Sequence, residues 1–224
     1  MTLRTPPSSP VRLHRGGRTR TWVGARFGGG FELGDRIWRR FLHGLGALAV
    51  VYLVLPPNFF VVVPTEVVLL LALELILVLE LLRHLRGWEL PTIRAYERGR
   101  IASFVWYAIA LTVALVVFPP PVAAAVIVGT ALVDPLLGEL RLRAARPAFS
   151  ILPGISTYAV LAAAMFAAFG IGWGAPLAAL ALITAVVAVA VEWPTWGTVD
   201  DDLAMTLVPG AAVTALLLAF PGLR

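Results

Sequence analysis

Seven apolar runs dominate the sequence, and each is long enough to cross a lipid bilayer. They cover about 38–56, 61–82, 101–118, 120–138, 151–170, 174–192 and 204–221. A transmembrane helix needs roughly 20 mostly apolar residues, and a helix satisfies its own backbone hydrogen bonds where no water is present. The runs therefore predict an all-α fold, a polytopic membrane helical bundle of about seven transmembrane helices.

Composition agrees with this class and limits the available chemistry. Apolar residues make up 59% of the chain and charged residues only 14%, far from the balance of a soluble domain. The chain has no cysteine, which excludes disulfides, thiolate catalysis and cysteine-ligated metals. The glycine-rich segment 27–30 lacks the lysine and the preceding strand of a P-loop, so we interpret it as linker. Carboxylates, histidines, arginines and hydroxyls remain as functional groups.

The distribution of arginines separates an N-terminal arm from the membrane domain and predicts the orientation of that domain in the membrane. Residues 1–35 contain PPSSP, RGG and FGGG, so we predict a flexible basic cytoplasmic arm there and a single transmembrane domain over 36–224. With the first run starting inside, the loops 83–100 and 139–150 share a side with the arm, and only Arg224 lies opposite. Cytoplasmic loops retain positive charge, so we expect the N-terminus to be cytoplasmic and the C-terminus outside.

Acidic residues gather on that same side. Asp134 lies near the inner end of the fourth run, Glu192 ends the sixth, and VDDDL at 199–203 precedes the seventh. Ionisable groups at membrane depth are costly and mark site hypotheses, although any one of them could be solvated or paired with an arginine. Carboxylate oxygens suit Mg²⁺ and arginine suits phosphate, so the whole cluster predicts an anionic, metal-bearing ligand.

Five short motifs of the chain resemble those of a known protein family. They are Arg39-Arg40-Phe41-Leu42-His43, Arg94-Ala95-Tyr96-Glu97, Val133-Asp134-Pro135 with Gly138, Ser150 with Gly154, and Asp200-Asp201-Asp202-Leu203. In this order and on one side of the membrane, they resemble motifs of the CTP-dependent polyprenol kinase family, which includes dolichol kinases, phytol kinases and a diacylglycerol kinase. The chain departs from the family pattern at Arg40 (usually Lys), Val133 (Gly), Asp202 (Asn) and Thr206 (Pro). A lysine usual just before the Ser-x-x-Gly segment is also absent, and Arg146 is the nearest basic residue.

The resemblance implies a CTP-dependent kinase that phosphorylates a membrane lipid alcohol, polyprenol- or dolichol-like, with Mg²⁺ at the cytoplasmic face, and it makes 36–224 the catalytic domain. We expect catalytic roles for Asp134, Asp201 and His43. Asp134 and Asp201 are the first choices as Mg²⁺ ligands, with Asp202 or Glu192 as support or a further ligand. The residues expected to hold the nucleotide are Arg39, Arg40, Arg94, Arg146, Ser150 and Gly154.

Several alternatives stay open at this point. A CTP:phosphatidate-type cytidylyltransferase shares the Gly-Asp and Ser-x-x-Gly style of motif, and a transporter or structural membrane subunit would also explain the spans. No residue discriminates CTP from ATP, and the lipid alcohol is not specified. Glu74, in the middle of the second run, could contact a partner helix in a homo-oligomer. The expected partners are the bilayer, the lipid and the nucleotide, with no nucleic acid.

Overall fold

The computed structural model describes residues 33–59, 63–88, 99–144, 146–192 and 200–223, and this part of the chain is all-α. It contains seven α-helices, three 3-10 helices and a pair of antiparallel strands of two residues each. The elements are α2 (Leu33–Leu45), η1 (Gly46–Val54), β1 (Asn58–Phe59), β2 (Val63–Pro64), α3 (Thr65–Arg86), α4 (Ser103–Val117), α5 (Pro120–Arg143), η3 (Pro147–Ser150), α6 (Ile151–Ala168), α7 (Ala175–Glu192), α8 (Asp201–Ala219) and η4 (Pro221–Leu223). The predicted all-α class is confirmed for the described residues.

Among the described residues, four helical segments are long and apolar enough to cross a membrane, as expected of an integral membrane protein, whereas the sequence predicts about seven spans. They are Pro120–Arg143, Ala148–Ala168, Ala175–Glu192 and Asp201–Ala219. Arg40–Val54 and Ser103–Val117 are apolar but shorter. The α3 helix has 22 residues, but charged residues interrupt its apolar sequence, and one of them, Glu74, is exposed.

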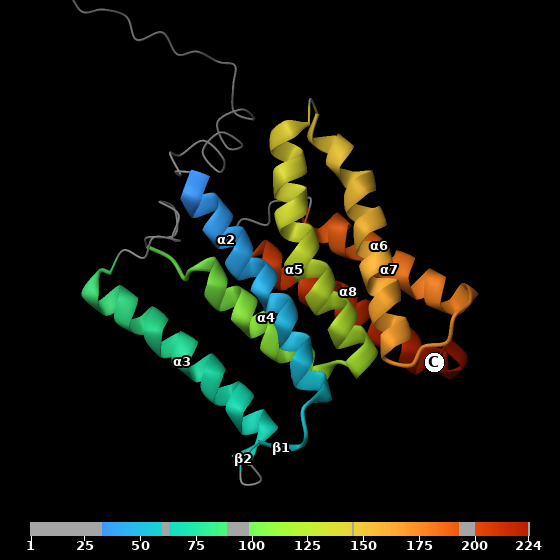
Figure 1. Cartoon of the computed structure of the whole chain (residues 1–224), viewed down its shortest axis with the longest axis horizontal. Helices are drawn as coiled ribbons and strands as arrows, with labels where there is room; N and C mark the ends of the chain where they lie inside the picture. The colour runs from blue at the N-terminus through green and yellow to red at the C-terminus, as the bar shows by residue number, and fades with distance from the viewer. Residues whose placement is uncertain (1–32, 60–62, 89–98, 145, 193–199, 224) are drawn as a thin grey trace, which may run out of the picture.

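The α5 helix lies at the centre of the bundle (Figure 1). It packs against α6, α8, α2 and η1, and the consecutive helices α6, α7 and α8 pack on one another before α8 returns to α4 and α5. Ala123, Ala124 and Ala125 are fully buried on α5, and such small side chains let neighbouring helices approach closely. The α3 helix packs on α4 at the edge of the bundle. One central helix therefore positions residues from most of the others.

A buried ion pair joins α3 to the start of α4. Arg83 donates to both carboxylate oxygens of Glu80 at 2.7 Å, and its guanidinium also donates to the Arg100 carbonyl at 2.8 Å. Glu80 accepts from the Ala102 backbone N–H at 2.9 Å. Since both charges are buried and saturated with hydrogen bonds, they fix where α4 begins.

Helix boundaries differ from the sequence prediction in several places, of which three bear on the site. The α2 helix begins at Leu33, so the last three residues assigned to the arm are helical; residues 1–32 lie outside the described part. The α5 helix runs through Pro135 and Gly138 to Arg143, so part of the predicted loop 139–150 is helix. The α8 helix begins at Asp201 rather than at 204, because a side-chain cap starts it earlier.

Two glycines of α5 make a matched test of this packing. A Cβ on Gly129 would lie 2.3 Å from Tyr158 Cζ, whereas a Cβ on Gly138 would meet nothing within 4 Å. We expect Gly129→Ala to destabilise the fold by about 1–3 kcal/mol through overpacking. Gly138→Ala should be neutral or stabilising by up to about 1 kcal/mol. Thermal unfolding in detergent measures both, and equal melting temperatures would contradict the close contact of α5 with α6.

Candidate functional site

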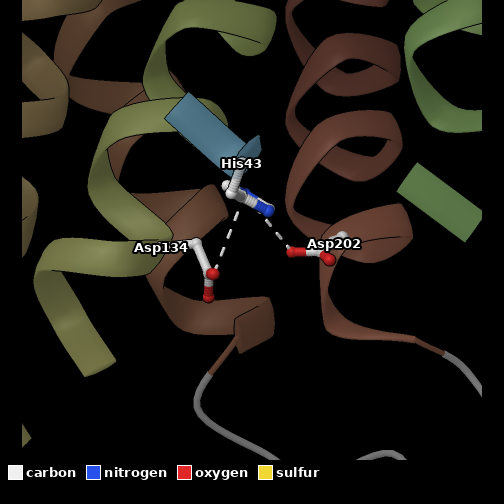
Figure 2. Close-up of side chains that lie close together, drawn as sticks. All are labelled: His43, Asp134 and Asp202. Carbon is white, nitrogen blue, oxygen red and sulfur yellow. Dashed lines mark ion pairs between the residues drawn. The ribbon is translucent and has the colours of Figure 1, made fainter. Parts of the chain in front are cut away.

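Three helices bring His43, Asp134 and Asp202 together. His43 lies in the last turn of α2, Asp134 in the C-terminal half of α5, and Asp202 in the first turn of α8. The His43 Nε2 atom is 3.8 Å from Asp134 Oδ2 and 3.7 Å from Asp202 Oδ1. Figure 2 shows the imidazole directed between the two carboxylates. Residues 159 positions apart in the sequence therefore meet, with Asp202 buried and the other two side chains partly exposed.

Tyr107 of α4 fixes the orientation of His43. The two rings stack with centroids 4.3 Å apart and planes inclined by 16°. The Tyr107 hydroxyl donates to the His43 carbonyl oxygen at 3.3 Å. Gly46 makes room for this ring, since a Cβ there would lie 2.1 Å from the Tyr107 hydroxyl oxygen. The imidazole is thus held on one face by an aromatic ring, and its edge faces the two acids.

The three consecutive aspartates have separate positions at the start of α8. Asp200 is the N-cap residue, and its Oδ1 accepts from the Asp202 backbone N–H at 3.1 Å. Asp201 and Asp202 occupy the first turn, where the helix dipole favours negative charge. Helix start chemistry accounts for Asp200, whereas Asp202 is directed to His43 and Asp201 to a second group of acids.

That second group consists of Asp134, Glu192 and Asp201. Each contributes one carboxylate oxygen, and these oxygens all lie within 4.8 Å of one another. Glu192 is buried at the end of α7 and accepts from Nη1 and Nη2 of Arg141 on α5, a bidentate pair. The pair neutralises the charge of Glu192, and Asp134 is common to both groups.

Arg40 forms an ion pair on the rim of the site. It contacts Glu139 of α5, which also accepts from Arg143 Nε at 2.8 Å. The Arg40 side chain is 34% exposed, so the guanidinium keeps access to solvent while it links α2 to α5. The predicted nucleotide role of Arg40 is compatible with this position.

The other predicted binding residues are spread more widely. The Arg39 side chain and all of Arg94 lie outside the described residues. Arg146 is exposed immediately before η3, and Ser150 is fully buried. A Cβ on Gly154 would lie 2.4 Å from Leu137 Cδ2, so close packing of α6 on α5 already requires glycine there.

Sequence reasoning missed three residues of this site. Glu139 could have been found, because Glu139 and Arg143 are four residues apart on one helix. The pairing of Arg141 with Glu192 and the stacking of Tyr107 on His43 join distant segments and leave no local signal.

Comparisons of the chain with protein-family models, with curated protein sequences and with solved structures find no match.

Proposed function

We propose that this protein is a CTP-dependent kinase that phosphorylates a membrane lipid alcohol, polyprenol- or dolichol-like, with Mg²⁺ at the cytoplasmic face. One observation supports this most strongly. The His43 Nε2 atom lies within 3.8 Å of a carboxylate oxygen of both Asp134 and Asp202. These three residues belong to three separate motifs that resemble those of the polyprenol kinase family.

The oxygen donors of the site fit Mg²⁺, which prefers carboxylates and retains several waters. Asp134 and Asp201 offer oxygens within 4.8 Å of one another and are the proposed ligands. Glu192 lies in the same group, but both of its oxygens accept from Arg141, so we assign it a supporting role. Asp202 lies on the other side of Asp134, next to His43. Bound Mg²⁺ would neutralise phosphate charge.

The protein groups have complementary roles in phosphoryl transfer. His43, held by Tyr107, orients and stabilises the carboxylates of Asp134 and Asp202. A carboxylate of this cluster accepts the proton of the attacking hydroxyl, which satisfies the need for a base near the acceptor. Of the arginines predicted to bind the nucleotide, Arg40 and Arg146 have described side chains, and these cations offset the charge of the triphosphate. Phosphoryl transfer needs mainly such positioning and electrostatic stabilisation.

A lipid acceptor follows from where the site lies along the helices. Asp202 is in the first turn of one candidate span, Glu192 ends another, and Asp134 is in the C-terminal half of a third. The acids therefore lie at one end of the membrane-crossing helices. A hydroxyl head group can reach them while its hydrocarbon tail stays among lipids.

Labelled nucleotides test the proposal. Purified protein is incubated in detergent with Mg²⁺, a panel of lipid alcohols and phosphatidate, and CTP labelled at either the α- or the γ-phosphate. The kinase proposal expects γ-label in the lipid and CDP in water. Transfer of α-label with release of pyrophosphate would identify a cytidylyltransferase, and no transfer to any lipid would favour a transporter or a structural subunit. ATP in place of CTP tests the donor.

Topology gives a separate prediction. We expect a reporter fused after Arg224 to lie outside the cytoplasm and one fused before residue 33 to lie inside, because 17 of the 18 arginines fall on one side of the proposed seven spans. Paired fluorescent and periplasmic enzyme reporters measure this. A cytoplasmic C-terminus would contradict the seven-span orientation.

A further inference from the structure

Proline 209 interrupts the hydrogen bonding of α8 next to the site. Pro209 lies inside the helix and has no N–H, so it cannot donate to the carbonyl four residues earlier, that of Met205. Thr130 of α5 supplies a donor instead, with its hydroxyl 3.2 Å from the Met205 oxygen. Thr130, Met205 and Pro209 are all buried. A side chain of the central helix therefore replaces a hydrogen bond that α8 cannot make.

Thr206 extends this contact toward the acids. The single proton of its hydroxyl has two acceptors in range, the Asp202 carbonyl oxygen at 2.9 Å and the Thr130 hydroxyl oxygen at 3.3 Å. Donated to Thr130, which itself donates to Met205, this proton links α8 to α5. Both threonines are 0% exposed. We call Thr130, Thr206 and the Met205 carbonyl the threonine clamp. It is a buried polar contact between α5 and α8 in a mostly apolar interior.

Each threonine of the clamp lies four residues from one of the aspartates that face His43. Thr130 precedes Asp134 by four residues on α5, and Thr206 follows Asp202 by four residues on α8. Residues four apart lie on the same face of a helix, one turn above each other. The clamp therefore joins the two helices one turn away from the two carboxylates that face His43.

We propose that the threonine clamp is a positioning device that sets the separation of Asp134 and Asp202. Helix pairs joined only by apolar contacts can slide or rotate, whereas a hydrogen bond to a carbonyl freed by proline fixes both register and rotation. The effect of the clamp on turnover rests on the proposed kinase function, whereas its effect on the separation of Asp134 and Asp202 does not. The test below keeps the two apart.

The catalytic test compares variants that keep or remove the hydroxyl. Thr130→Val and Thr206→Val keep the branched shape, and Thr130→Ser keeps the hydroxyl. Thr184→Val is the control, because Thr184 is equally buried but donates only to Leu180 of its own helix, at 2.6 Å. We expect the Thr130 and Thr206 valine variants to lower kcat about 10- to 100-fold with little change in KM for the lipid. Thr130→Ser should restore most of kcat, and Thr184→Val should match the wild type.

The geometric test does not need activity. The chain has no cysteine, so Asp134→Cys/Asp202→Cys introduces the only two thiols. Their parent carboxylates offer oxygens within 4.8 Å, so we expect rapid oxidation to a disulfide or cross-linking by a short bifunctional reagent. Adding Thr130→Val or Thr206→Val should slow the reaction about tenfold, whereas adding Thr184→Val should not.

The outcomes separate the two claims. An unchanged cross-linking rate in both valine backgrounds would overturn the clamp, whatever the enzyme does. A Thr130-dependent rate in a protein that transfers no phosphate to lipid would support the clamp and overturn the kinase. If one valine variant does not fold, judged by size-exclusion chromatography, the other carries the test, since each removes a different hydroxyl of the clamp.

Discussion

Replacement of Asp134 by asparagine should lower phosphoryl-transfer turnover by about two to three orders of magnitude, which corresponds to about 3–4 kcal/mol of transition-state stabilisation. Asp134 is the residue common to the two acidic groups, one with His43 and Asp202 and one with Glu192 and Asp201. Asparagine keeps the shape of the side chain and removes the charge that would face both the cation and the imidazole. Asp201→Asn should show a loss of similar size.

Two neighbouring positions serve as comparisons for Asp134→Asn. Asp200→Asn should keep most of the activity, because asparagine caps a helix as well as aspartate and can still accept from the Asp202 N–H. Asp202→Asn keeps an oxygen facing His43, so it should lose less than Asp202→Ala. The measurement is lipid phosphorylation against Mg²⁺ concentration, with size-exclusion profiles as a folding control. Near wild-type turnover in Asp134→Asn would contradict the assigned site.

The Arg141–Glu192 pair should show the largest effect on stability. Glu192 is buried and lies near Asp134 and Asp201, so Arg141→Gln leaves an uncompensated carboxylate among other acids. Breaking one side of a buried ion pair costs about 3–5 kcal/mol. We expect Arg141→Gln and Glu192→Gln each to lower the melting temperature in detergent markedly. The double variant Arg141→Gln/Glu192→Gln should recover much of it, because no buried charge is left alone.

The double variant also decides the role of Glu192. If Glu192 supports the site only through its charge balance with Arg141, the stable double variant should retain most of the turnover and its Mg²⁺ dependence. A double variant that folds but is inactive at saturating Mg²⁺ would instead make Glu192 a cation ligand. Arg143→Gln is the matched control, since Arg143 is exposed and pairs only at the surface with Glu139.

The positions of the helices could be predicted from the sequence, whereas their exact ends could not. Apolar runs of about 20 residues identify helices because lipid and buried packing both demand them, and all seven observed helices overlap a predicted span. Helix ends depend on caps and pairs instead. Asp200 caps α8, which therefore begins three residues before the predicted start. At the end of α5, Arg141 pairs with Glu192 of α7.

The candidate site could be predicted in part. The order and sidedness of the motifs selected His43, Asp134 and the VDDDL segment, and the structure brings His43, Asp134 and Asp202 into contact. The sequence favoured Asp201 over Asp202 beside Asp134, but both lie near it, each in a different group of ionisable side chains. Which face of α8 each aspartate occupies is set by the rotation of the helix. That rotation depends on long-range contacts such as that of Thr130 with the Met205 carbonyl, which no local pattern encodes.

One measurement tests the central claim most directly. Wild-type protein and Asp134→Asn are reconstituted in nanodiscs with a polyprenol, supplied with Mg²⁺ and γ-labelled CTP, and followed in a single turnover for label in the lipid phase. The account predicts that the wild type converts polyprenol to its monophosphate with one CDP formed per phosphate transferred, and that Asp134→Asn folds but transfers at least about 100-fold more slowly. Equal transfer by both proteins, or no transfer by the wild type to any lipid alcohol, would contradict it.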